Sequence, residues 1–327
     1  MDEYAVEAAG LTRVFHSGHG GEVTAVAGID LRVPRGCIFG LVGPDGAGKT
    51  TTIRMLCAII PPTAGWARVA GYDVVREAGR VHAHTGYMSQ RFTLYGDLTV
   101  EENIRFFAEI FGVPLRQREE RMAELLAFAG LGPFRARRAE HLSGGMKQKL
   151  ALACTLIHEP DVLMLDEPTT GVDPVARRDF WKILYALLGR GVTIVVSTPY
   201  MDEAERCSMV AFLADGRLLA VGTPEELKRR LGAQVLVLRA RPQAMAQKIA
   251  QETAGVLDVE IMGDVLHLFV AEAEPLIPVL RDRLAARGIE VRSLRPTPPS
   301  MEDVFMRLAA PTDAAKDRLT TDREDGA

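Results

Sequence analysis

Short apolar runs separated by glycine-rich turns and helical patterns predict an α/β fold for the first two thirds of the chain. The apolar run at residues 37–42 predicts a buried strand, and the helical pattern at 53–56 follows it after a glycine-rich loop. Further strands are predicted at residues 5–11, 23–33, 67–69, 85–88, 162–165, 193–197, 209–214 and 217–222.

The pattern changes character between about residues 98 and 160, where helical periodicity replaces strands. Thr99 and Glu102 have the spacing of a capping box, which opens a helix through residue 111. A second amphipathic helix is predicted at 116–129, and Ser143 opens a third that runs to residue 158. We therefore predict an α-helical subdomain inserted into a first domain of residues 1–231.

Beyond Gly232 the periodicity predicts a second, smaller α+β domain at residues 233–309. Its strands are expected at residues 235–240, 256–262, 265–270 and 289–294, and its helices at 242–253 and 275–287. This βαββαβ order is ferredoxin-like. Ser300 then starts a short capped helix, and residues 310–327, which are short of large apolar side chains, are predicted to be disordered.

Composition narrows the class of protein. The 327 residues include 47% hydrophobic and 25% charged positions, enough for one large and one small globular domain. The net charge of -4 gives no general attraction to nucleic acid, so no nucleic-acid partner is expected. The four widely spaced cysteines favour reduced core thiols and a cytosolic protein. No apolar run approaches about 18 residues, so any membrane association is expected to come through a partner.

The loop after the strand at 37–42 has the spacing Gly-x4-Gly-Lys-Thr, which is typical of a phosphate-binding loop. Its glycines let backbone N–H groups line a cradle at a helix N-terminus. Lys49 is expected to reach the β- and γ-phosphates while packing little, and Thr50 to bind Mg²⁺. The loop consists of Gly43, Pro44, Asp45, Gly46, Ala47, Gly48, Lys49, Thr50 and Thr51.

Two adjacent carboxylates, Asp166 and Glu167, follow the buried strand at 162–165. In an enzyme with a phosphate-binding loop, the first would hold Mg²⁺ and the second would orient or deprotonate the attacking water. Ser143 and the two glycines after it form a second possible anion site at a helix N-terminus. Phe15, next to a glycine-rich loop, is either a base-stacking aromatic or an ordinary core residue.

With these motifs, residues 1–231 resemble the nucleotide-binding subunit of an ATP-binding cassette (ABC) transporter. The resemblance implies a P-loop NTPase cassette with a RecA-like core, an antiparallel β subdomain and the helical insertion. The ending of the chain resembles the C-terminal extension of antibiotic- and multidrug-exporter ATPase subunits. The matching positions are Phe15 for adenine stacking, residues 43–51 for Walker A, Gln90 for the Q-loop, residues 142–146 for the signature, Asp166 and Glu167 for Walker B, and Asp173 for the D-loop.

The resemblance also implies cofactors, partners and roles. ATP and Mg²⁺ are expected, with Gln90 near both the metal and the reacting water, and Glu167 as the catalytic base. The family dimerises head to tail, so Ser143, Gly144, Gly145 and Asp173 would contact ATP held by a second cassette. The chain is expected to dock on separate permease subunits at the cytoplasmic face of the cell membrane.

Two positions depart from the family pattern. Met146 replaces the usual glutamine of the signature, and Pro199 stands where the switch histidine is expected. Proline offers neither a side-chain donor nor a backbone N–H, so slow hydrolysis is predicted at this site. Tyr200 is the nearest residue with a hydroxyl that could substitute.

Three functions stay open at this point. The chain is an ATPase subunit of a multidrug or small-molecule exporter, a poorly hydrolysing cassette of an asymmetric heterodimer, or a soluble ABC ATPase of translation or DNA repair. The last class usually shows two cassettes, zinc fingers or coiled coils, and none is visible in the sequence. Phe92, Leu94 and Tyr95 form either a groove for a permease helix or part of the subdomain core.

Overall fold

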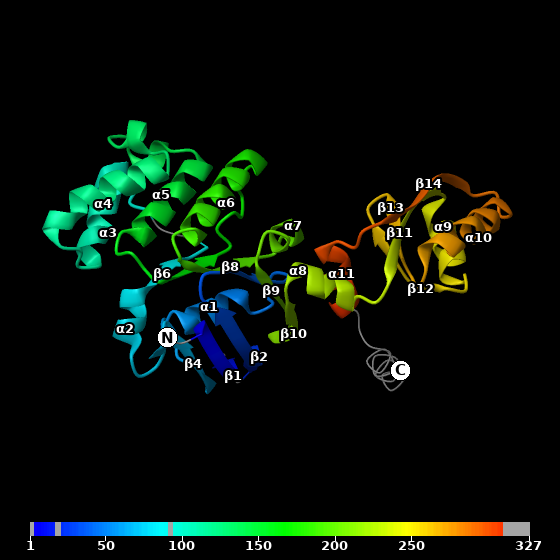
Figure 1. Ribbon diagram of the computed structural model, residues 1–327, viewed down its shortest axis with the longest axis horizontal. Coiled ribbons are helices and arrows are strands. Elements are labelled where there is room, and N and C mark those ends of the chain that lie inside the picture. The colour runs from blue at the N-terminus through cyan, green and yellow to red at the C-terminus, as the bar shows by residue number, and fades with distance from the viewer. Residues whose placement is uncertain (1–2, 17–20, 91–93, 310–327) are drawn as a thin grey trace. The chain divides into compact units, whose positions relative to one another are not determined.

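The computed structural model describes residues 3–16, 21–90 and 94–309. The chain divides into two compact units, one ending at Pro224 and the other beginning at Glu225 (Figure 1). The domain boundary predicted at residues 231–233 comes after this division in the sequence, and it stays a prediction. The predicted disordered tail at 310–327 lies outside the described residues, as does Phe92.

A six-stranded sheet in the order β10-β9-β3-β8-β7-β6 forms the centre of the first unit. Its strands from β9 to β6 pair in parallel, and β10 pairs antiparallel to β9. Every residue of β3, β7 and β8 is buried, as expected for parallel strands covered on both faces. The strands are β3 (Ile38–Val42), β6 (Thr85–Met88), β7 (Val162–Asp166), β8 (Thr193–Thr198), β9 (Met209–Ala214) and β10 (Arg217–Gly222).

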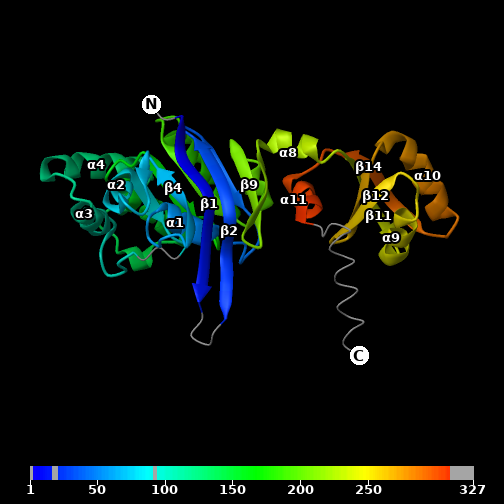
Figure 2. The ribbon, with the colours of Figure 1, turned by 90° about the horizontal axis from the view of Figure 1, so that it is seen from below.

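An antiparallel sheet in the order β2-β1-β4-β5 makes the second layer of this unit. Figure 2 shows β1 and β2 as a long hairpin. Strand β1 runs on to His16, past its predicted end at residue 11, so Phe15 lies within it. The buried face of this sheet shares one apolar cluster with Ile53, Met55 and Leu56. The strands are β1 (Tyr4–His16), β2 (Glu22–Pro34), β4 (Ala64–Val69) and β5 (Tyr72–Asp73).

The predicted helical insertion is present and has its own apolar core between three helices. The capping box is confirmed: the Glu102 N–H donates to Thr99 Oγ1 at 3.2 Å, and the Thr99 N–H donates to Glu102 Oε2 at 2.8 Å. Helix α5 ends before its predicted end at residue 158, because Glu159 has a φ of +55° and Pro160 follows. The helices are α3 (Val100–Ile110), α4 (Leu115–Phe128), α5 (Gly144–Leu156) and the short 3₁₀ turns η1 (Gly132–Phe134) and η2 (Ala139–His141).

Four helices of the first unit lie outside that insertion. Figure 1 shows α1 on the side of the six-stranded sheet that carries β1 and β2, and α5 and α6 on the other side. No prediction covered α2, α6 or α7. These four helices are α1 (Lys49–Leu56), α2 (Ala78–His84), α6 (Pro174–Leu188) and α7 (Met201–Ala204).

The second unit contains the ferredoxin-like arrangement that was predicted. Its antiparallel sheet has the order β12-β13-β11-β14, so β13 lies between β11 and β12 as in a split βαβ unit. Leu236, Leu268 and Leu280 belong to the cluster that joins this sheet to α9 and α10. The elements are α8 (Pro224–Arg230), β11 (Gln234–Arg241), α9 (Gln243–Gln251), β12 (Val256–Met262), β13 (Val265–Val270), α10 (Ala273–Ala285), β14 (Glu290–Thr297) and α11 (Met301–Ala309).

The four cysteines are free and buried, which confirms their prediction as core thiols. Burial raises the pKa of the Cys37 thiol to about 11, so this group stays protonated at neutral pH. In the described part of the chain, no helix has both the length and the apolar character needed to cross a membrane.

Candidate active site

The phosphate-binding loop joins β3 to α1 in a conformation that requires glycine. Gly46 and Gly48 have φ angles of +81° and +100°, which side chains disfavour. A Cβ on Gly43 would lie 2.0 Å from the carbonyl oxygen of Leu213, and a Cβ on Gly48 would lie 2.4 Å from that of Ala25. The loop can therefore approach its neighbours closely and direct backbone N–H groups toward an anion at the start of α1.

Lys49 is the first residue of α1, and its ammonium group is buried. Its Nζ donates to the carbonyl oxygens of Gly43 at 2.8 Å and Pro44 at 2.9 Å, and lies 3.2 Å from Glu167 Oε1. Only 3% of the residue is exposed. The expectation that Lys49 packs little is therefore wrong, because its side chain is buried and its charge is paired with Glu167.

Asp166 is the last residue of β7 and has no exposed surface. Its Oδ1 accepts hydrogen bonds from Thr50 Oγ1 at 3.0 Å and Ser197 Oγ at 2.7 Å. Its Oδ2 is buried and has no hydrogen-bond partner among the described residues. Burial raises the pKa of the Asp166 carboxyl above its ordinary value, and the hydrogen bonds from Ser197 and Thr50 act against that rise.

This unpartnered oxygen tests whether the site suits Mg²⁺. A buried carboxylate oxygen without a donor is costly unless a cation or another donor satisfies it. Mg²⁺ prefers oxygen ligands and is usually held by one or two carboxylates plus substrate phosphates. The Asp166 carboxylate and the Thr50 hydroxyl provide that donor set beside the phosphate-binding loop, so these residues fit the ion.

Glu167 follows Asp166 with a φ of +48°, an uncommon conformation for a residue with a side chain. Its N–H donates to Ser197 Oγ at 3.0 Å, which holds this backbone in place. Its Oε2 accepts from Gln90 Nε2 at 2.9 Å and Thr170 Oγ1 at 3.3 Å. The structure thus brings Gln90, just past β6, to the carboxylate predicted to act as the base.

A cleft of about 250 Å³ at the carboxyl ends of β3 and β7 is lined by Lys49, Thr50, Gln90 and Glu167 among others. Asp166 is not among the lining residues, and it adjoins them through its hydrogen bond from the Thr50 hydroxyl. In open parallel sheets, ligands bind at this edge. The lining residues are Ala25, Asp45, Gly46, Gly48, Lys49, Thr50, Thr51, Gln90 and Glu167.

Apart from Gly43, Pro44 and Ala47 of the loop itself, five residues predicted to contact nucleotide do not line that cleft. Phe15 is 39% exposed near the end of β1, with the Arg13 guanidinium 4.7 Å from its ring centre. Ser143 caps α5 by accepting the Met146 N–H at 3.4 Å. Asp173 caps α6 by accepting the N–H groups of Val175 and Ala176. The five are Phe15, Ser143, Gly144, Gly145 and Asp173.

The segment after β8 carries the predicted departure at Pro199. Thr198 accepts the Gly43 N–H on its carbonyl oxygen at 3.3 Å, so this segment begins directly beside the phosphate-binding loop. The Tyr200 ring lies against the Arg177 guanidinium of α6 at 4.2 Å. Tyr200 is not among the residues that line the cleft, so its predicted role as a substitute donor gains no support.

Ser197 was missed, although it contacts both Walker B residues. It lies at the polar end of the buried strand β8, which pairs with β7. A hydroxyl residue at the end of an apolar strand, in a chain with a Walker B motif on another strand, is the signal that could have found it. Thr170 was missed for a simpler reason, because a threonine in a turn has many possible roles.

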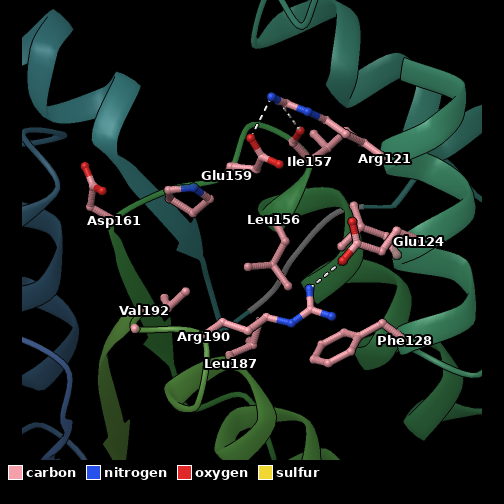
Figure 3. A pocket seen from close by; sticks show the side chains of 13 residues that line it. Arg121, Glu124, Phe128, Leu156, Ile157, Glu159, Asp161, Leu187, Arg190 and Val192 are labelled. Carbon is pink, nitrogen blue, oxygen red and sulfur yellow. Dashed lines mark hydrogen bonds and ion pairs between the residues drawn. The ribbon is translucent and has the colours of Figure 1, made fainter. Parts of the chain in front are cut away.

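A second cavity, of about 350 Å³, lies between α4, the end of α5 and the turn after α6 (Figure 3). Its rim carries two ion pairs, Arg121 with Glu159 and Arg190 with Glu124, each at 2.6 Å. None of its lining residues belongs to the phosphate-binding cleft. Among the described residues, no side-chain nitrogen or oxygen of its lining is buried without a hydrogen-bond partner, whereas Asp166 Oδ2 next to the phosphate-binding loop is.

Two family models match this chain. The model described as ABC transporter covers residues 26–170, and the model described as ATP-binding protein DrrA1-3-like, C-terminal domain covers residues 222–309. The daunorubicin/doxorubicin resistance ATP-binding protein DrrA of Streptomyces peucetius is 36% identical over 321 residues, covering 97% of this chain and 95% of that protein. The chain belongs to the ABC transporter ATP-binding proteins.

Other ABC relatives agree. Nod factor export ATP-binding protein I of Paraburkholderia xenovorans is 40% identical, over 88% of this chain and 93% of its own length. The probable multidrug ABC transporter ATP-binding protein YbhF of Escherichia coli K12 is 41% identical over 94% of this chain. This chain spans about half of that relative, 52% of its length.

Solved ABC structures confirm the predicted cassette fold. A component of an ABC transporter complex from Clostridium perfringens superposes with a TM-score of 0.62 at 25% identity, covering 71% of this chain and 95% of that one. An ATP-binding subunit of another ABC transporter gives the same TM-score at 29% identity, covering 70% and 93%.

Proposed function

We propose that this ABC protein is the ATP-binding and ATP-hydrolysing subunit of an exporter for drugs or other small molecules. One observation carries the proposal: Lys49, Thr50 and Glu167 line one cleft, and Asp166, which accepts a hydrogen bond from Thr50, has a buried oxygen without a partner among the described residues. The names of the relatives above, which mention export, multidrug transport or drug resistance, support the exporter class.

ATP binding uses the loop of residues 43–51. Its N–H groups and Lys49 hold the β- and γ-phosphates, and Phe15 stacks on adenine at the outer end of the site. Thr50, Asp166 and Gln90 hold Mg²⁺, which when bound neutralises charge on the phosphates during transfer.

In the proposed reaction, ATP binding weakens the ion pair between Lys49 and Glu167, and this prepares Glu167 for hydrolysis. A γ-phosphate beside Lys49 competes for its ammonium charge, and this frees Glu167 Oε1 to accept a proton from the attacking water. Gln90 and Thr170 keep their hydrogen bonds to Oε2, so the carboxylate stays oriented while its other oxygen acts as the base.

The residues outside the cleft serve a second cassette. Ser143, Gly144, Gly145 and Asp173 of one chain complete the ATP site of its partner, and two composite sites form in the dimer. Separate permease subunits hold the dimer at the cytoplasmic face of the cell membrane.

The permease contact that we propose lies beside the helical insertion. Tyr95 is 45% exposed and stacks edge-on against Phe106, with ring centres 4.6 Å apart. Leu94 instead packs against the core of the insertion. We therefore divide the two roles: Tyr95 and Phe106 meet a permease helix, and Leu94 supports the subdomain.

Pro199 favours a second candidate function, that of a nucleotide-binding partner whose own site hydrolyses slowly. Loss of one preorganised donor typically costs about 10²–10³ in rate. The signature Ser143-Gly144-Gly145 is intact and can still serve a second cassette that carries its own histidine.

Glu167→Gln tests the main proposal. The variant should bind Mg-ATP as the parent does and lose about 10²–10⁴ in hydrolysis rate, because the base is gone. It should also accumulate as an ATP-bound dimer in size-exclusion chromatography. Glu120→Gln is the matched control and should behave as the parent, because Glu120 is an exposed carboxylate of α4 with no hydrogen bond or ion pair to another side chain in the described part of the chain.

Measurable hydrolysis at equal rates in Glu167→Gln and the parent would contradict the role of Glu167 as the base. A parent that binds Mg-ATP without measurable hydrolysis would favour the second candidate.

A further inference from the structure

Glu203, in the short helix α7, is a carboxylate with no exposed surface and no role in the function proposed above. An isolated buried carboxylate is expensive unless it is paired and hydrogen-bonded. Glu203 has such partners on both oxygens. Its Oε1 accepts from Thr169 Oγ1 at 2.7 Å and Trp181 Nε1 at 3.1 Å, and its Oε2 accepts from Thr198 Oγ1 at 2.7 Å.

A guanidinium supplies the balancing charge. Arg177 Nε lies 3.7 Å from Glu203 Oε1, within ion-pair distance but beyond a hydrogen bond. This Nε is buried and makes no hydrogen bond among the described residues, so its interaction with Glu203 is electrostatic. The same guanidinium covers the Tyr200 ring.

These partners come from three segments that border the ATP cleft. Thr169 lies two residues after Glu167, in the turn that the Thr170 N–H closes onto the Glu167 carbonyl oxygen. Thr198 accepts the N–H of Gly43, the first residue of the phosphate-binding loop. Arg177 and Trp181 belong to α6, which begins after Asp173.

We propose that Glu203 is a positioning residue for ATP hydrolysis, which holds the turn after Glu167 in register with the phosphate-binding loop. This inference rests on the function proposed above. Glu203 is fully buried and is not among the residues that line the cleft, so its loss should misplace the base without removing a contact to ATP. The predicted signature is a fall in kcat with little change in ATP affinity.

The hydrogen-bond directions explain why the carboxylate suits this position. Thr198 Oγ1 accepts the Tyr200 N–H at 3.0 Å while donating to Glu203. A glutamine amide facing Thr198 would add a second donor to that hydroxyl, and it would remove the charge that Arg177 balances. Glu203→Gln therefore keeps the shape of the side chain while loosening the link between the segments.

The test separates positioning from plain stability by changing one hydroxyl at a time. Thr169→Val removes the donor to Glu203 at nearly constant shape, and Thr169→Ser retains it. Thr155→Val is the matched control, because Thr155 is also a buried threonine, and its hydroxyl donates within α5 to the Ala151 carbonyl oxygen at 2.8 Å. Each variant and Glu203→Gln is compared with the parent by single-turnover ATP hydrolysis, equilibrium ATP binding and thermal melting.

Glu203→Gln and Thr169→Val should each lower the hydrolysis rate about tenfold or more, with ATP affinity within about twofold of the parent. Thr169→Ser should recover most of the rate. Thr155→Val should lower the melting temperature and leave the rate unchanged. If Glu203→Gln and Thr169→Val behave as Thr155→Val does, Glu203 is structural and the inference is overturned.

Different results would contradict the proposed ATPase function and the proposed role of Glu203. A parent that does not hydrolyse ATP contradicts the proposed function and the role of Glu203 with it. A parent that hydrolyses ATP at the same rate as its Glu203 and Thr169 variants contradicts the role of Glu203 alone.

Discussion

Two buried carboxylates in the first unit, Asp166 and Glu203, have opposite hydrogen-bonding states. They lie at the ends of neighbouring strands, Asp166 on β7 and Glu203 just after β8, and neither has exposed surface. Asp166 accepts two hydrogen bonds on Oδ1, and its Oδ2 has no partner in the part of the chain that the structure describes. Glu203 accepts hydrogen bonds on both oxygens and has a guanidinium beside it.

This difference in hydrogen bonding distinguishes a carboxylate suited to bind a ligand, Asp166, from one suited to position neighbouring segments, Glu203. A buried carboxylate oxygen without a donor is costly unless a group outside the chain satisfies it, and in the function that we propose a cation bound with ATP would do so. A buried carboxylate that its own chain satisfies has no capacity left for a ligand, so its contribution is to hold the surrounding segments. The strained backbone of Glu167, with a φ of +48°, lies next to Asp166, the carboxylate with capacity left for a ligand.

The largest effect should come from Asp166→Asn. Asparagine keeps the size but not the charge that holds Mg²⁺, and a metal ion supplies several kcal/mol of transition-state stabilisation, so hydrolysis should fall by about 10³-fold. Single-turnover hydrolysis at saturating Mg-ATP measures this. A loss no larger than that of Glu203→Gln would erase the distinction between the two carboxylates.

Pro199→His tests the segment that joins the two regions. A histidine there restores a donor toward the γ-phosphate, and the rate should rise by up to about 10²-fold. Pro199→Ala is the control, because it removes the proline ring without adding a donor. Equal rates for the two variants would show that the backbone, rather than the missing donor, limits this site.

Lys49→Ala should destabilise the protein even without nucleotide. Breaking the buried pair with Glu167 should lower the free energy of unfolding by about 3 kcal/mol, because a largely buried carboxylate loses its cation. Lys182→Ala breaks an exposed pair with Asp179 and should cost less than about 1 kcal/mol. Chemical denaturation of both variants compares the two costs, and equal costs would mean that the burial of Lys49 contributes no stability.

The smallest effect is a pH dependence. Burial raises the pKa of Asp166, so the folded state binds more protons than the unfolded state between the ordinary pKa and the raised one. The protonated carboxyl therefore favours the folded state at low pH, and this contribution to stability is lost as pH rises through the raised pKa. Asp166→Asn cannot ionise and should avoid that loss. Without Mg²⁺, the melting temperature of Asp166→Asn should therefore rise relative to that of the parent as pH increases from about 4, the ordinary pKa of an aspartate, through the raised pKa of Asp166. A constant difference would argue against the raised pKa.

The sequence predicts the cleft well because its signals are local. The glycine spacing of residues 43–48 follows from backbone geometry, and the capping box of Thr99 and Glu102 spans a single turn. The strand before Asp166 is apolar throughout because both of its faces are covered.

The Glu203 contacts could not be predicted in this way. Thr169 and Glu203 are 34 positions apart, and Ser197 and Asp166 are 31 apart, so no periodicity links them. The burial of Lys49 was missed for the same reason, since its partner Glu167 comes from a distant strand. Helix α6, which brings Trp181 to Glu203, received no prediction.

Equilibrium binding of ATP to the parent and to Lys49→Ala, each with and without Mg²⁺, tests the nucleotide site most directly. The parent should bind ATP more tightly with Mg²⁺ than without it, and Lys49→Ala should lose about 10²-fold in affinity, because a charge-assisted contact to phosphate is gone. Lys182→Ala should bind as the parent does. Equal ATP affinity in Lys49→Ala and the parent would contradict the assignment of this cleft as the nucleotide site.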